Sequence, residues 1–154
     1  MIIAYVCYGS AHSSIVAAAI HVGFLPNDRI PAFEEFLSLP HYDMTEGNQI
    51  GIPFYMGVDE FNNDVYAIGA KSGRKIMMKA VKSFLRESGI HEEEIMLIDT
   101  LPAIGLMTKF GGMTSRRFKM ISIGRPFTVY GIIKKYKNFL DIVNSVKFRL
   151  KELD

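Results

Sequence analysis

Hydrophobic positions are densest at the start of the chain, where an apolar run over residues 1–8 is rich in Ile, Val and Tyr. A continuous run of this kind is typical of a strand that is buried on both faces. Small residues then form a tight turn, and an Ala-rich stretch over residues 15–22 predicts a helix. Ser13 and Ser14 stand where the N-cap of that helix is expected. The pattern therefore predicts a strand, a tight turn and a helix.

Further along, strand-like and helix-like segments alternate. Two short apolar runs flank a turn-rich segment and predict a β-hairpin, whereas residues 41–52 have the composition of a loop. The helix expected from residue 71 has an apolar face made of Ile76, Met77, Ala80, Val81, Phe84 and Leu85. After the first helix, the expected helices cover residues 31–39, 71–88, 101–108 and 130–152, and the expected strands cover 53–59, 64–69, 95–98 and 118–123.

This alternation predicts the α/β class, as a three-layer sandwich with a mostly parallel sheet, one antiparallel hairpin and helices on both faces. The length of 154 residues fits a single domain over residues 1–154. In open sheets of this kind ligands bind beyond the carboxyl ends of the strands. Three predicted strand ends carry polar or basic residues, namely residues 7–14, Asp99 with Thr100, and Gly124 with Arg125.

Composition narrows the function classes. The single cysteine excludes an intramolecular disulfide framework, and four scattered histidines give no zinc-binding spacing, so no metal site is predicted. No apolar stretch approaches the roughly 20 residues of a membrane span. The N-terminus lacks the basic flank and cleavage site of a signal peptide. We therefore expect a cytoplasmic protein without a membrane partner, and the oligomeric state stays open.

Charge is distributed unevenly, although the net charge is only +2. Residues 1–70 contain eight acidic side chains and one basic side chain, Arg29, whereas residues 71–154 contain seventeen basic and eight acidic side chains. Such a division could build a basic face for an anionic partner. One hypothesis is therefore a non-catalytic interaction module whose basic C-terminal half binds nucleic acid or an acidic partner.

The first loop suggests a different hypothesis, because a turn that leads into a helix N-terminus favours anions. Residues 7–14 have the length of a Walker A motif, with Ser14 at the magnesium-side hydroxyl. Ser13 takes the lysine position, and Cys7 and His12 take the two glycine positions. The apolar strand ending in Asp99 is similar to a Walker B strand and could hold Mg²⁺ beside a phosphate ligand. The missing charge would then come from Lys71, Arg74 or Lys75.

The same loop is also similar to that of the low-molecular-weight tyrosine phosphatases and related arsenate reductases, in which a Cys, five residues and Arg-Ser follow the first strand. Cys7 falls on the nucleophile, Gly9 on a loop glycine and Ser14 on the serine that would support the thiolate. The essential arginine position is Ser13, which argues against an ordinary phosphatase. The alternative is a buried cysteine at a strand end.

His12 is the polar residue of this loop with the widest range of roles. Beside a helix N-terminus it could be a neutral donor to an anion or a general base, or a turn histidine that caps backbone groups.

The sequence favours a protein that binds a phosphate-bearing small molecule or nucleotide. If the protein is catalytic, we expect a degenerate P-loop-type enzyme. The candidate catalytic residues are Cys7, His12 and Asp99. The candidate phosphate-binding residues are Gly9, Ser10, Ala11, His12, Ser13, Ser14, Arg117 and Arg125, and the secondary candidates are Lys71, Arg74, Lys75 and Thr100.

Nearly the whole chain resembles the bacterial domain-of-unknown-function family 3189 of spore-forming Firmicutes. The resemblance rests on residues 8–14 with the following Ala-Ala-Ala-Ile-His, and on residues 71–75, 98–102, 115–117 and 123–126. It implies a bacterial cytoplasmic protein. It implies no activity, so the functional argument depends on the residues themselves.

Overall fold

A computed structural model describes residues 1–104 and 121–153, with side chains given for residues 1–104 and 126–153. Four strands form one mixed sheet in the order β2-β3-β1-β4. The central strand β1 is parallel to both β3 and β4, and β2 pairs antiparallel with β3 as the expected hairpin. The strands are β1 (Ile2–Cys7), β2 (Phe54–Val58), β3 (Asp64–Gly69) and β4 (Ile95–Asp99).

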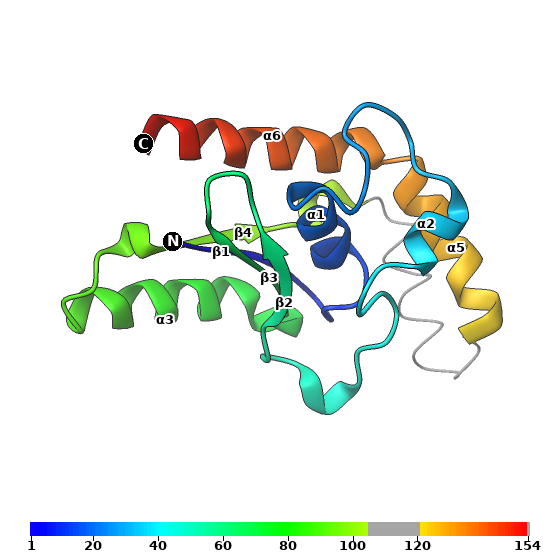
Figure 1. Cartoon of the computed structure of the whole chain (residues 1–154). Helices are drawn as coiled ribbons and strands as arrows, with labels where there is room; N and C mark the ends of the chain where they lie inside the picture. The colour runs from blue at the N-terminus through cyan, green and yellow to red at the C-terminus, as the bar shows by residue number, and fades with distance from the viewer. Residues whose placement is uncertain (105–120, 154) are drawn as a thin grey trace.

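Helices cover both faces of this sheet, which confirms the α/β class and the layered architecture. Figure 1 shows α6 (Tyr136–Leu153) along one side of the sheet and α3 (Arg74–Glu87) along the other. Helix α1 (Ser13–His21) lies between the sheet and α6, while α2 (Phe33–Leu37) and α5 (Ile121–Ile133) lie together at one end of the molecule. The predicted helix over residues 31–39 is therefore present in its central part.

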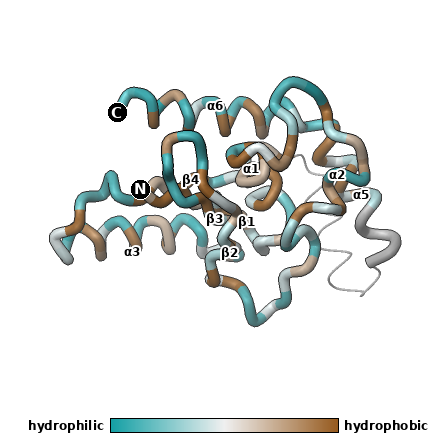
Figure 2. Tube along the Cα trace, in the orientation of Figure 1, coloured by the Kyte–Doolittle hydropathy of each residue, from teal (hydrophilic) through white to brown (hydrophobic). Residues whose placement is uncertain are grey.

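The core forms around α1, whose nine residues are all buried. Three consecutive alanines keep this helix narrow, so the sheet and α6 can both approach it closely. From α6, Phe139, Val143, Val146 and Leu150 recur at helical spacing and are buried in the same cluster. In Figure 2 the hydrophobic colour is concentrated where α1 meets the strands, whereas α3 and α6 alternate between the two colours. A glycine with a φ of 82°, Gly23, follows the end of α1, a conformation that is common after the last residue of a helix.

A chain of buried polar groups joins β1, α1 and the hairpin. The Tyr5 hydroxyl lies 2.6 Å from His21 Nδ1, and His21 Nε2 lies 3.0 Å from Asp59 Oδ2. Asp59 also accepts hydrogen bonds from the backbone N–H groups of Phe61 and Asn63 and from the Asn63 amide. A carboxylate only accepts, so a neutral His21 donates from Nε2 to Asp59 and accepts the Tyr5 proton at Nδ1. Every group of the network is then satisfied.

This network predicts a pH dependence of stability. Burial lowers the pKa of His21 from 6.5, despite the hydrogen bond to Asp59 and the nearby Glu60 carboxylate, and Lys147 lowers it further. The unfolded chain therefore takes up a proton near its ordinary value while folded His21 stays neutral. Stability that is present above about pH 6.5 is consequently lost as the pH falls below it. We expect a smaller free energy of unfolding at about pH 5.5 than at about pH 7.5, measured by urea titration.

The control for this prediction is His91→Gln, because His91 is exposed and outside the network. That variant should keep the wild-type pH dependence. An unfolding free energy that is constant or rises towards about pH 5.5 would contradict the prediction.

Asp59 adds a loss of stability at lower pH. Burial raises the pKa of its carboxyl group, but the hydrogen bonds from Asn63, His21 and Phe61 outweigh this and lower the pKa from 3.8. Stability is therefore lost again as the pH falls below about 3.8.

The expected strand over residues 118–123 is wrong where the structure describes it, because residues 121–123 begin helix α5. Pro126 lies inside this helix, although residues 124–126 were expected to close a strand. A short apolar run has too few positions to separate the helical period from the strand period, and Pro126 made a helix here less expected because it lies beyond the first described turn. Arg125 therefore lies in a helix and not at a strand end, and its side chain is outside the described residues.

Two helix predictions also need correction. The expected helix over residues 130–152 is two helices, α5 and α6, which are separated at residues 134–135. The break lets Tyr136 enter the core, where its hydroxyl donates to the carbonyl of Pro26 at 2.6 Å. The expected helix over residues 101–108 begins only as a 3₁₀ turn, Leu101–Ala103, and Ile104 is already extended; the later residues lie outside the described part.

The predicted apolar face of α3 is only partly correct. Met77, Val81 and Leu85 are half-buried towards the sheet, together with Met78, which the prediction omitted. Ile76 and Phe84 belong to the predicted face but are 77% and 73% exposed. No residue of α3 is fully buried. The helix thus uses a narrower part of its surface to contact the sheet than the sequence indicates.

Candidate functional site

The carboxyl ends of the three parallel strands meet at one edge of the sheet. In the register of the sheet, Cys7 pairs with Gly69 on β3, and Val6 pairs with Asp99 on β4. The loop over residues 8–12, which we call the first loop, begins at this edge and leads into α1. Its approach to β3 is close, because a Cβ atom on Gly69 would lie 2.6 Å from the nitrogen of Ser10.

Cys7 is the last residue of β1, directly before the first loop, and is 3% exposed. Its Sγ accepts hydrogen bonds from the Ser10 backbone N–H and from the Ser14 hydroxyl, both at 3.0 Å. Ser10 reaches this position with a φ of 51°, in the left-handed region. Ser14 therefore contacts the sulfur atom of Cys7, and the role of that contact in any chemistry stays a prediction.

A second loop binds the first loop from residues that the sequence did not single out as site residues. Asp43 Oδ1 lies 3.1 Å from His12 Nε2, and the Asp43 backbone N–H donates to the carbonyl of Ala11 at 3.0 Å. The Thr45 hydroxyl donates to the carbonyl of Ser10 at 2.7 Å. The His12 ring also contacts Tyr42 edge-on, with ring centroids 5.3 Å apart. Residues 42–45 therefore fix the shape of the first loop.

Ser13 and Ser14 are in the first turn of α1, and His12 is at the N-cap position without a side-chain capping hydrogen bond. The expected N-cap role of the two serines is therefore wrong. The Ser13 hydroxyl instead pairs with Thr100 Oγ1 at 3.1 Å, and Thr100 Oγ1 lies 3.0 Å from the carbonyl of Val6. Thr100 thus ties β1, β4 and α1 together at the edge of the sheet.

Asp99 is half-buried and already has partners. Its Oδ2 accepts a hydrogen bond from Arg74 Nε at 2.8 Å, and its Oδ1 accepts one from the Leu101 backbone N–H at 3.0 Å. A Mg²⁺ ion at Asp99 would have to compete with this ion pair. Among residues 1–104 and 126–153, no group of three or more His, Cys, Asp or Glu side chains could hold a metal ion.

The other predicted cations differ in their relation to the first loop. The Lys71 backbone N–H donates to the carbonyl of Tyr8 at 2.8 Å, so this residue lies beside the loop, and its side chain is exposed. Lys75 is exposed on α3, one turn after Lys71. Arg117 and the side chain of Arg125 lie outside the described residues. The structure thus joins residues 7–14 to Thr100 and to the Lys71 backbone, and it pairs Arg74 with Asp99.

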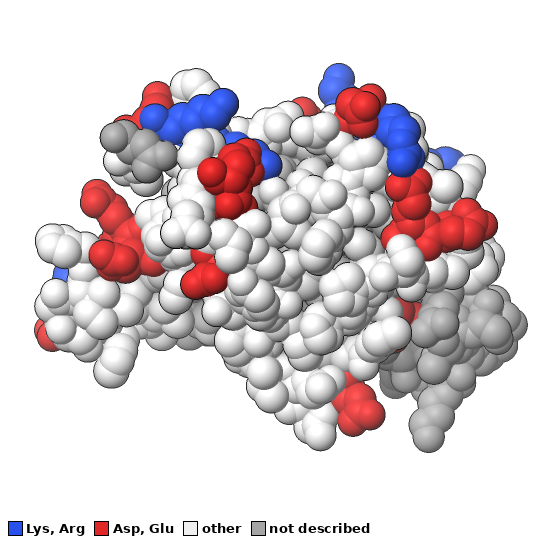
Figure 3. Space-filling model, viewed as in Figure 1, with Lys and Arg blue, Asp and Glu red and all other residues white. Residues whose placement is uncertain are grey.

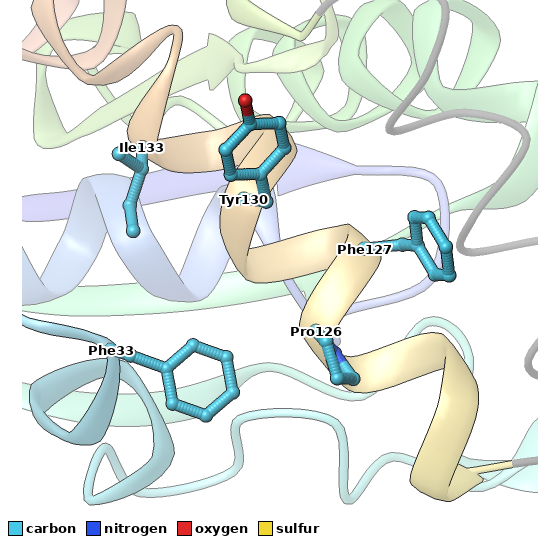
Figure 4. A pocket seen from close by; sticks show the side chains of 5 residues that line it. All are labelled: Phe33, Pro126, Phe127, Tyr130 and Ile133. Carbon is cyan, nitrogen blue, oxygen red and sulfur yellow. The ribbon is translucent and has the colours of Figure 1, made fainter.

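A separate cavity of about 370 Å³ lies between α2 and α5. Phe33 contributes to it from α2, and the remaining lining residues come from α5 (Figure 4). The sequence analysis did not select any of them. The cavity is lined by Phe33, Pro126, Phe127, Tyr130 and Ile133.

The fold and the first loop define an α/β protein with a mixed four-stranded sheet and a strand–loop–helix corner at its carboxyl edge. The chain belongs to the family described as "Protein of unknown function (DUF3189)", whose model matches residues 2–148. This confirms the resemblance found in the sequence. No curated protein and no solved structure matches the chain significantly. None of the helices in the described residues is long and apolar enough to cross a membrane.

Proposed function

We propose that the protein binds a phosphate-bearing small molecule or nucleotide at the first loop and the N-terminus of α1. The observation that carries this proposal is the way two segments hold the corner. Asp43 and Thr45 of the second loop bond to the first loop, and Thr100 after β4 bonds to the start of α1. The N–H groups in the first turn of a helix lack helical partners and carry its positive dipole end. A rigid arrangement of such groups favours an anion.

Positive charge and a polar side chain are available near this corner. Lys71 adjoins the first loop through its backbone, and Arg74 is held at the same edge of the sheet by Asp99. His12 Nε2 contacts Asp43, which leaves Nδ1 as the ring atom that can reach a ligand. The hydroxyls of Ser13 and Ser14 already contact Thr100 and Cys7, so they would support the loop rather than bind the anion.

The experiment is a thermal-shift and calorimetric titration of the full chain with inorganic phosphate, phosphorylated metabolites and nucleotides. A ligand at about one hundred times its Kd adds about 2.7 kcal/mol of stability, which raises the Tm by about 5 °C or more. His12→Ala and Ser14→Ala should weaken binding at least about tenfold, through loss of a contact and of loop support respectively. His91→Ala, at an exposed histidine, is the matched control.

Stabilisation by none of these anions would remove the proposal. Binding that is unchanged in both His12→Ala and Ser14→Ala would place the ligand elsewhere. A Cys7→Ser variant separates binding from chemistry, because it keeps a hydrogen-bonding side chain of similar size but lacks the thiol nucleophile. If the variant keeps binding but loses turnover of a ligand, Cys7 has a catalytic role. A degenerate P-loop-type enzyme stays a prediction beside the binding function proposed here.

The second hypothesis, an interaction module that binds nucleic acid or an acidic partner, stays a prediction. Its motivation was the excess of basic residues in the second half of the chain. In the described residues much of that excess lies on α3 and α6. The exposed surface of α3 supports a more definite inference.

A further inference from the structure

Helix α3 forms the outer layer on its side of the sheet and exposes most of its surface. After Arg74, its half-buried side chains are those of Met77, Met78, Val81 and Leu85. Because an α-helix turns 100° per residue, these four residues lie on one narrow arc. The rest of the fourteen-residue helix, apart from its first residue, is exposed.

A basic stripe runs along one side of the exposed surface. It consists of Lys75, Lys79, Lys82 and Arg86, which are all exposed. Their spacing of four, three and four residues places them above one another on successive turns. Arg86 pairs with Glu92, and the only acidic residue within α3 is Glu87. The face drawn in Figure 3 shows little blue over α3.

An apolar ridge runs along the other side of the same surface. Ile76, exposed Ala80 and Phe84 follow one another at a spacing of four residues, so they lie on neighbouring turns within an arc of about 80°. The two large side chains are 77% and 73% exposed. These are the two most exposed of the large apolar side chains in the described residues. An apolar ridge beside a basic stripe on one exposed helix fits a partner that is both anionic and apolar.

We propose that α3 is a docking surface for an anionic phospholipid bilayer. The lysines and the arginine of the basic stripe would contact lipid phosphates, and Ile76 and Phe84 would enter the boundary between headgroups and acyl chains. Basic amphipathic helices bind membranes in this way, by combining charge attraction with shallow apolar burial. The helix would lie on the bilayer and not cross it.

The same observations favour a bilayer over nucleic acid. Nucleic-acid backbones would satisfy the basic stripe through phosphate contacts, but they would leave Ile76 and Phe84 exposed to water. A bilayer satisfies both groups and needs no matching shape, which suits the convex surface of a single outer helix. Its surface also carries the required negative charge when anionic lipids are present.

The experiment is co-sedimentation of the full chain with vesicles of phosphatidylcholine alone or of phosphatidylcholine and phosphatidylglycerol in equal parts. We expect partitioning into the anionic vesicles at least about tenfold above the neutral ones, with loss at high salt because surface charges are screened. Lys75→Gln combined with Lys79→Gln should lower it about thirtyfold, the equivalent of two surface cations. Ile76→Ser combined with Phe84→Ser should lower it as well, and to a similar extent in low and moderate salt.

The matched control is Lys137→Gln combined with Lys151→Gln, which removes two exposed cations from α6. It should keep most of the binding, and all variants should melt close to the wild-type temperature because the changed side chains are exposed. Equal binding to both vesicle types, binding to neither, or an equal loss in the α6 control would overturn the proposal. So would tighter binding of an oligonucleotide that depends on Lys75 and Lys79, since the partner would then be nucleic acid.

Discussion

Replacing Asp59 by alanine is expected to lower the free energy of unfolding by about 3–5 kcal/mol, because several buried donors would lose their acceptor at about 1–3 kcal/mol each. The Asp59 side chain is fully buried beside His21. Its two oxygens accept hydrogen bonds from the backbone of Phe61, from the backbone and side chain of Asn63, and from His21. Alanine would leave these donors buried without acceptors. Equilibrium denaturation in urea, monitored by circular dichroism, measures the change.

Two comparisons make this result specific. Asp28→Ala removes an exposed carboxylate and should change stability by no more than about 0.5 kcal/mol. Asp59→Asn keeps one acceptor oxygen and should be intermediate. The Asn63 amide oxygen also accepts from the N-terminal ammonium group at 3.0 Å, so loss of Asp59 should loosen the N-terminus as well. A loss below about 1 kcal/mol in Asp59→Ala would show that the network contributes little to stability.

The fold was predictable where the hydrophobic pattern is long or strongly punctuated. The first strand, the Ala-rich helix and the hairpin have clear periods and clear turn residues, and all three are present in the structure. Residues 118–123 contain too few positions to distinguish a strand from a helix by their hydrophobic period. In the structure, residues 121–123 are helical. The break at residues 134–135 has no proline or glycine signal. It depends on the burial of Tyr136, which is a tertiary contact.

The candidate site was predictable in its local part only. The sequence places Cys7, His12 and Ser14 in one loop because they are close along the chain, and the Ser14–Cys7 hydrogen bond follows from that spacing. Asp43 and Thr45 are more than thirty residues away from the atoms they contact. An Asp and a Thr in a loop have the same composition as any surface turn, so no local signal indicates that they bind the first loop. Only the fold reveals this second half of the site.

Gly69→Ala is expected to distort the first loop and to lower the free energy of unfolding by about 3 kcal/mol, near the upper end for an overpacked site. An added Cβ would lie 2.6 Å from both the nitrogen and Oγ of Ser10, and 2.7 Å from the carbonyl carbon of Gly9. Two of these three atoms belong to the backbone. They cannot move away cheaply, because the loop is held by Cys7 and by the Thr45 hydroxyl. If the first loop binds an anion, affinity should fall at least about tenfold in the same variant.

The matched control is Gly73→Ala, four residues further along the chain. Gly73 has a φ of −80°, and an added Cβ there would meet no atom within 4 Å. This variant should change stability by no more than about 0.5 kcal/mol, since the restriction of the unfolded chain by alanine offsets the loss of glycine at the N-cap of α3. Urea denaturation of both variants, together with anion titration of each, separates a general effect of losing glycine from a steric clash with Ser10. Equal stabilities for the two variants would mean that the first loop can move to accommodate the added methyl group. Its close approach to β3 would then not be needed to hold the loop in its conformation.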